Sequence, residues 1–221
     1  VVIGAIVGAV LVGVMLMTHI GILPMLGLAL AAGVAIASFL PLKGRSLRRL
    51  PLPTWGMVFA HFGIAVALFG AACDSAFTQE RLIAARIGQI TEVGPWRVML
   101  QSVAPVAGPN WTAVEGRLAA SYKGGAPVTL TPQARDFWAP PAQTNESALL
   151  TRWNGQLYAV LGEEGGDGRW QLRLWWKPYV IYIWLGGALV GLGGLLALIG
   201  RVSADLKRRY VRRRGAIRRG E

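Results

Sequence analysis

Four apolar runs, each about as long as a lipid bilayer is thick, constrain the fold of this chain most strongly. A membrane-spanning helix needs about 20 such residues, and the runs cover roughly Val1–Thr18, Ile22–Leu42, Thr54–Cys73 and Pro178–Gly200. His61 is the only Asp, Glu, Lys, Arg or His within them. With 53% apolar residues arranged in this way, the chain cannot be a disordered basic tail or a soluble nucleic-acid-binding protein. We therefore expect an α-helical integral membrane protein.

The segment between the third and fourth runs has the pattern of a small β domain. Short runs rich in Val, Leu, Tyr and Trp are separated there by turn signals, of which Asn154-Gly155 is the strongest because it suits a two-residue type I′ hairpin. About a hundred residues suffice for one sandwich or barrel. We predict three membrane helices within 1–73 (about 1–18, 22–42 and 54–73, joined by a basic loop 43–53), a β-rich domain 74–174, a fourth helix 175–200 and a basic tail 201–221.

The distribution of charge predicts the orientation. The net charge is +12, yet residues 74–174 carry nine basic and nine acidic side chains and are neutral. The excess lies in the loop 43–53 and the tail 201–221, with Lys177 as the last unit. Short basic segments remain in the cytosol, so we expect both there and the β domain outside. The tail is interpreted as a topology signal that touches anionic lipid, and no nucleic-acid binding is expected.

Three further predictions concern the start of the chain, its only cysteine and His19. The chain begins at Val1 inside an apolar run, so we expect it to be the C-terminal part of a longer membrane protein. Its single cysteine, Cys73, excludes an internal disulfide. We interpret Cys73 as a structural residue, with a reactive thiol as the alternative. His19 is expected near the outer membrane surface as a hydrated interfacial residue.

Aromatic residues and glycines give less specific signals. The tryptophans of the β segment fit either core packing or a stacking surface for a flat ligand; they are Trp96, Trp111, Trp138, Trp153 and Trp170. At the start of the fourth run, an aromatic belt at the membrane surface is predicted for Trp175, Trp176, Tyr179, Tyr182 and Trp184. Gly187 and Gly191 form a small-xxx-small pair, and Gly186, Gly193 and Gly194 extend this small surface, which predicts close packing of the helix against another.

His61 is the residue in the membrane spans that is able to carry chemistry. It lies about 10 Å into a hydrocarbon core of about 30 Å, where a polar side chain is by default a candidate functional site. A neutral imidazole bonded to a neighbouring backbone carbonyl or hydroxyl is the competing interpretation. Among functions, ligation of haem iron suits an imidazole between apolar helices. Gly56, Ala60 and Gly63 flank it along the chain and are expected to leave room for a macrocycle.

Several blocks of this sequence together resemble one known family. The first block runs through the third apolar segment and contains His61, and the others follow in order along the chain: Leu52–Gly70, Gly108–Ala113, Pro132–Arg135, Thr144–Ala148, Gln156–Glu163 and Trp176–Gly187. They are similar to the late part of the CcmF/NrfE family of cytochrome c haem lyases. The resemblance covers about residues 50–200.

The resemblance implies a multi-pass protein of the bacterial inner membrane that acts in cytochrome c maturation, with 74–174 in the periplasm. Such proteins take haem, their substrate, from a periplasmic haem chaperone and attach it to the CxxCH thiols of apocytochrome c. Implied partners are that chaperone, apocytochrome c with its thiol-handling and delivery subunits, and quinol as an electron source. The family also holds a structural haem b between two transmembrane histidines, and His61 resembles the second of these.

We accordingly expect the full-length protein to be an enzyme and this chain to supply His61 as one axial ligand of haem b. The second axial ligand and the family's tryptophan-rich haem-handling segment are expected outside this chain, and no catalytic residue is identified in it. The alternative is a non-catalytic subunit, either for quinol-linked electron transfer through haem b or as a scaffold. A transporter subunit with a structural His61 is a third reading of the same residues.

Overall fold

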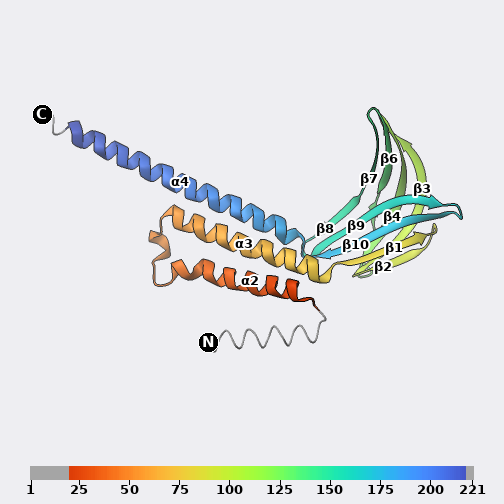
Figure 1. Cartoon of the computed structure of the whole chain (residues 1–221), viewed down its shortest axis with the longest axis horizontal. Helices are drawn as coiled ribbons and strands as arrows, with labels where there is room; N and C mark the ends of the chain where they lie inside the picture. Colours follow the sequence, from red (N-terminus) through yellow and green to blue (C-terminus); the bar gives the residue numbers. More distant parts are fainter. Residues whose placement is uncertain (1–19, 218–221) are drawn as a thin grey trace. The chain divides into compact units, whose positions relative to one another are not determined.

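The structure, a computed structural model, describes residues 20–217, with side chains described as far as Arg208. It divides into two compact units (Figure 1). One unit is helical and contains the described residues up to Ala76 and those from Tyr182 onward. The other, Phe77–Ile181, is built of β-strands. The predicted first helix, 1–18, and His19 lie outside the described residues.

The described part of the helical unit contains three long helices, labelled in Figure 1. They are α2 (Ile22–Phe39), α3 (Leu52–Phe77) and α4 (Ile181–Ile217), and the loop after α2 holds two short 3₁₀ helices, η1 (Leu40–Leu42) and η2 (Leu47–Arg49). Among the described residues, three helical stretches are long and apolar enough to cross a membrane: Ile22–Leu42, Leu52–Phe77 and Ile181–Arg208. The structure therefore contains three of the four predicted helices as membrane-span candidates.

The predicted start of the fourth helix was wrong by six residues. Strand β10 (Arg169–Pro178) continues through Trp175 and Trp176, which pair with Tyr158 and Leu157. Tyr179 then has a positive φ of 58°, which interrupts regular structure, and α4 begins only at Ile181. Trp175 and Trp176 consequently belong to the β-sandwich rather than to an aromatic belt. At the other end, α4 continues to Ile217, into the segment expected to be a tail.

The β unit is a sandwich of two antiparallel sheets. The first sheet has the strand order β1-β10-β9-β8, and the second has the order β2-β3-β4-β6-β7, with β5 paired to β4. The remaining bounds are β1 Gln79–Ala85, β2 Ile90–Val93, β3 Trp96–Ala107, β4 Trp111–Tyr122, β5 Val128–Leu130, β6 Gln133–Trp138, β7 Pro141–Glu146, β8 Ala148–Arg152 and β9 Gly155–Gly165. The turn-separated runs of the sequence thus form strands, as predicted.

Alternation along the strands builds the sandwich core. In β9, Leu157, Ala159 and Leu161 are buried and the residues between them are partly exposed, which is the period of two expected for a strand with one covered face. The core cluster draws on both sheets, with members including Trp96, Val98, Leu100, Leu118, Ala120, Leu157, Leu172, Leu174 and Trp176. Removal of this apolar surface from water is the main source of the domain's stability.

Two glycines make room for the indole of Trp176. A Cβ atom on Gly94, whose φ is 55°, would overlap this ring, and one on Gly155 would lie 2.7 Å from it and 2.6 Å from Lys177 O. Because Gly155 is needed at this close approach, the predicted hairpin turn shifts by one residue. Arg152 pairs with Gly155, so Trp153 and Asn154 form the loop. Neither of them has a positive φ, and the predicted type I′ turn was therefore wrong.

Glycines also determine the packing of the helices. On α3, Gly56, Gly63 and Gly70 recur every seven residues, and an added Cβ on any of them would lie within 2.8 Å of α4 backbone atoms. Gly186 and Gly193 make the same close approach from α4. A seven-residue repeat keeps such a seam between two helices continuous.

The predicted small-residue pair lies on another part of α4. A Cβ added at Gly187 or Gly191 would meet nothing within 4 Å, so these glycines do not mediate the contact with α3. The prediction of close packing was right for the helix and for Gly186 and Gly193, which were expected to extend the small surface, and wrong for the central pair.

Candidate functional site

His61 lies on a face of α3 that no other described helix covers. One side of α3 packs on α4 through Gly63, and another packs on α2, where the rings of Phe62 and Phe39 are 5.3 Å apart. At 100° per residue, His61 lies about 100° from Phe62 and about 160° from Gly63, so it points away from both of these sides. It is exposed, as are Met57 and Ile64, one turn before and one turn after it. An imidazole thus stands in the middle of an otherwise apolar helix face.

The ring of His61 is held by its own helix. Its Nδ1 lies 2.8 Å from the backbone oxygen of Met57, four residues earlier. With the proton on Nδ1, this nitrogen donates to that carbonyl, and Nε2 carries a free lone pair. Such a bond fixes the tautomer and the orientation of an imidazole that binds metal through its other nitrogen. The side chain therefore fits an axial ligand of haem iron.

The expected role of the neighbouring glycines was wrong. Gly56 and Gly63 were expected to leave room for a macrocycle beside His61, but both are occupied by the contact with α4. Their direction from the α3 axis differs from that of His61 by well over 90°, because two residues correspond to about 200° and five to about 140°. Any planar group bound at His61 would lie against Met57 and Ile64 instead.

Cys73 is not part of the His61 face. Its side chain is free and only 2% exposed, near the end of α3. Burial among apolar residues agrees with the structural interpretation. Within residues 20–217, no group of three or more His, Cys, Asp or Glu side chains is arranged to hold a metal ion.

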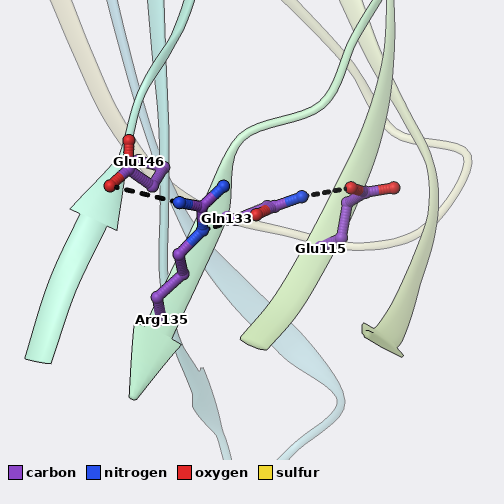
Figure 2. A network of polar contacts seen from close by, with 4 residues as sticks. All are labelled: Glu115, Gln133, Arg135 and Glu146. Carbon is purple, nitrogen blue, oxygen red and sulfur yellow. Dashed lines mark hydrogen bonds and ion pairs between the residues drawn. The ribbon is translucent and has the colours of Figure 1, made fainter. Parts of the chain in front are cut away.

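A second polar arrangement, which no local sequence pattern predicts, lies on the β-sandwich (Figure 2). Gln133 Nε2 donates to Glu115 Oε2 at 2.5 Å, Arg135 Nε donates to Gln133 Oε1 at 2.8 Å, and Arg135 Nη1 lies 3.5 Å from Glu146 Oε1. The Arg135 guanidinium also stacks 4.4 Å above the Trp111 ring. The residues come from β4, β6 and β7, and only the cross-strand register brings them together.

Arg135, at the centre of this network, has a partner on each side. Arg135 is only 27% exposed and has a hydrogen bond, a carboxylate and an aromatic face as partners. Charge-assisted bonds of this kind hold neighbouring strands in register. We interpret the network as a structural clamp of the second sheet rather than as a reactive centre.

The five tryptophans predicted as core or stacking residues lie in different environments. Trp96 is buried at 1% exposure and packs on Tyr122 and Trp176, with ring centroids 5.1 Å and 6.3 Å away. Trp170 is partly buried against the same core, while Trp138 and Trp153 are 53% and 73% exposed. The core interpretation is therefore right for Trp96 and in part for Trp170. Trp111 stacks against the Arg135 guanidinium, and the five do not share one stacking surface.

Comparisons with known proteins agree with this architecture. Residues 76–178 match the family described as the CcmF C-terminal beta-sandwich. The chain is 33% identical over 175 residues to "Cytochrome c-type biogenesis protein CcmF" of Escherichia coli K12, covering 78% of this chain and 27% of that protein. It is 34% identical over 154 residues to "Cytochrome c-type biogenesis protein CycK" of Bradyrhizobium diazoefficiens, covering 70% and 23%.

A more distant relative and a solved structure extend the comparison. "Cytochrome c-type biogenesis protein NrfE" of Haemophilus influenzae is 28% identical over 153 residues, covering 69% of this chain and 24% of that protein. The solved structure named "Cytochrome c Heme Lyase CcmF" superposes with a TM-score of 0.68 at 21% identity, over 88% of this chain and 34% of that one. It shows the same fold. The chain spans about a quarter of the length of its curated relatives.

Proposed function

The chain belongs to the CcmF/NrfE family, and we propose on that basis that it functions in cytochrome c maturation. Its relatives are named as cytochrome c-type biogenesis proteins, and the similarity extends over both the helical and the sandwich units. The protein that contains it would be a multi-pass protein of the bacterial inner membrane. In this proposal the sandwich lies in the periplasm, and the loop 43–53 and the segment after residue 200 lie in the cytosol.

His61 would supply one axial ligand of a transmembrane haem b. The observation that carries this proposal is the exposed imidazole on the open face of α3, with Nδ1 bonded to Met57 O and Nε2 directed to no described partner. A buried neutral histidine with a purely structural role would be expected to face a neighbouring helix. The open apolar face instead has the character of a surface against which an apolar macrocycle and a further helix pack.

The residues of this chain would act by holding and shielding. Haem iron with two axial ligands supplies one-electron transfer when bound. Met57 O would keep the Nδ1 proton in place, so that Nε2 presents its lone pair at a fixed angle. Met57 and Ile64 would exclude water from that nitrogen. The α3–α4 seam would hold the helix that carries His61 rigid, because glycines in the contact let the two backbones approach closely.

The activity of the whole protein would be the transfer of haem from a periplasmic haem chaperone to the CxxCH thiols of apocytochrome c. This chain would contribute the His61 ligand and the sandwich domain to that enzyme. The delivery and thiol-handling subunits of the apocytochrome would be further partners, and quinol would be an electron source. The second axial ligand would come from outside the described residues.

Replacement of His61 in the full-length protein tests the ligand assignment. We expect His61→Ala to abolish the b-type absorbance of the purified protein and to stop maturation of a reporter cytochrome c in cells. Leu52→Ala, at an exposed residue on the side of α3 opposite to His61, is the control and should keep both. Membrane abundance of each variant is measured alongside. Retention of the haem with unchanged spectra in His61→Ala would remove the assignment.

A further inference from the structure

The two faces of the β6–β7 part of the sandwich differ in a way that points to a ligand. On one face, Glu115, Gln133, Arg135 and Glu146 satisfy one another (Figure 2). On the other face, a cavity of about 630 Å³ opens between these strands and the ends of β9 and β10. Besides Arg135 and Thr144, its lining contains six amide or carboxylate side chains: Asp136, Gln143, Asn145, Glu163, Glu164 and Gln171.

The six amide and carboxylate side chains of this cavity are exposed to solvent. None of the six has a side-chain hydrogen bond or ion pair within residues 20–217, whereas Glu115, Gln133, Arg135 and Glu146 bond to one another. Amides and carboxylates gathered around one hollow are groups that a polypeptide can bind. Trp170, partly buried, adds an apolar wall.

A glycine helps to shape the cavity. A Cβ added at Gly162 would lie 2.9 Å from Gln171 Cβ and 3.2 Å from its Oε1. The absence of a side chain on β9 therefore leaves space in which the Gln171 amide lies across the neighbouring strand. A larger residue at position 162 would displace this amide from its place in the cavity wall.

The cavity is bordered by a free strand edge, because β7 is the last strand of its sheet. Gly116 N–H donates to Pro132 O, and Trp138 N–H donates to Asn110 O. Because the direction of the backbone groups alternates along a strand, every second residue from 132 to 138 directs its N–H and C=O groups toward β4. Ala134 and Asp136 belong to this set.

The residues that pair with these two are on β7, namely Asn145 and Gln143. Their N–H and C=O groups therefore point away from β6, toward the open edge. Their side chains also line the cavity. Backbone edge and cavity thus meet at the same two residues.

The charge of the lining selects among extended ligands. Asp136, Glu163 and Glu164 are acidic, and the one basic lining residue, Arg135, is engaged on the other face by Glu146 and Trp111. An unpaired strand edge binds extended peptides through main-chain hydrogen bonds, and every second side chain of the peptide then contacts the surface beside that edge. The complementary side chains for three carboxylates are Lys and Arg.

We propose that β7 and this cavity form a docking site for an extended, basic segment of a partner protein, which adds antiparallel to β7. All pairs of this sheet are antiparallel. In that register, the peptide residues that bond to Gln143 and Asn145 carry the side chains that face the carboxylates, because directly opposite residues share a face. The site is independent of haem binding at His61.

A peptide-binding assay on the full chain in nanodiscs of neutral lipid tests the proposal. The probe is a fluorescein-labelled ten-residue peptide of alternating Lys and Thr, and its counterpart has Glu in place of Lys. We expect only the Lys peptide to raise fluorescence anisotropy saturably. The double variant Glu163→Gln/Glu164→Gln should weaken its binding at least tenfold, whereas Glu80→Gln/Glu92→Gln, away from the cavity, should change it less than twofold. Equal binding of both peptides, or equal effects of both variants, would overturn the proposal.

The peptide itself tests the strand pairing without altering the protein. N-methylation of every Lys should reduce binding at least tenfold, because these N–H groups face β7, while N-methylation of every Thr should leave most of it. Gln143→Pro, which removes an outward N–H, should likewise weaken binding at least tenfold, and Gln143→Ala less than threefold. Equal effects of the two methylations would contradict strand addition, and a loss confined to the Thr-methylated peptide would contradict the antiparallel register.

Discussion

Opposite kinds of packing stabilise the helical unit and the β-sandwich internally. In the helical unit, α3 and α4 approach through Gly56, Gly63, Gly186 and Gly193, where the absence of side chains allows backbone contact. In the sandwich, large side chains such as Trp176 fill the space between sheets. Lipid is as apolar as the helices, so their association depends on close packing. A domain in water gains stability by burying apolar area. Truncation of a large core side chain should therefore destabilise the sandwich, and enlargement of a glycine in the α3–α4 contact should destabilise the helical unit.

The largest expected effect is that of Trp176→Ala in the sandwich. Trp176 is 5% exposed and contacts Trp96 and Tyr122, so its removal leaves a cavity that the two close glycines cannot fill. We expect a loss of about 3–5 kcal/mol in the free energy of unfolding of this domain. Denaturant titration followed by near-UV circular dichroism measures it. Trp153→Ala, at a ring that is 73% exposed, is the control and should cost under about 0.5 kcal/mol.

Enlargement of a seam glycine is the corresponding test of the helical unit. A Cβ at Gly63 would lie 2.7 Å from Gly186 O and 2.8 Å from Val190 N, both backbone atoms that cannot rotate away. Gly63→Val should destabilise the α3–α4 contact by about 1–3 kcal/mol. The midpoint of thermal unfolding in detergent reports this loss. Gly187→Val, in open space on α4, should leave the midpoint unchanged. Equal shifts for both variants would contradict a glycine seam.

A smaller effect is expected at the polar network of Glu115, Gln133, Arg135 and Glu146 on the sandwich. Arg135→Ala removes a hydrogen bond to Gln133, an ion pair with Glu146 and a stacking contact with Trp111. Because Glu146 is 50% exposed, solvent weakens the ion pair. We expect a loss of about 1 kcal/mol, most of it from stacking and from the hydrogen bond that the guanidinium donates to the Gln133 amide. A double-mutant cycle with Glu146→Ala separates the ion pair, whose share should fall further in high salt.

The smallest effect is expected at the surface pair of Arg97 and Glu92. Their atoms Nε and Oε1 are 3.3 Å apart, but the side chains are 59% and 71% exposed. Arg97→Ala should change the free energy of unfolding by less than about 0.5 kcal/mol. The same denaturant titration measures it, and a loss above 1 kcal/mol would mean that surface charge contributes to this domain as strongly as the network does.

Much of the fold follows from local pattern. Apolar runs of membrane length predict α2 and α3, and alternating runs between turn signals predict strands such as β5, Val128–Leu130, which the structure reproduces. The start of α4 could not be placed in this way. Trp175 and Trp176 are as apolar as the helix that follows, and only their pairing with β9 assigns them to a strand.

The same limit applies to side-chain roles. The seven-residue glycine repeat is visible in the sequence, but which glycines face another helix depends on that helix's position; Gly187 and Gly191 matched the common motif and face open space. Glu115 and Gln133 are eighteen residues apart and meet only through the register of β4 and β6. His61 could be identified from the sequence as a candidate, because a lone polar residue in an apolar span is a local feature.

Chemical rescue at His61 tests the central claim most directly. In the full-length protein, His61→Gly removes the imidazole and leaves space on the exposed face of α3. We predict that this variant lacks the low-spin b-type absorption spectrum and that added imidazole restores it, since a free imidazole can take the place of Nε2. An unchanged spectrum in His61→Gly without imidazole would contradict the assignment of His61 as an axial haem ligand.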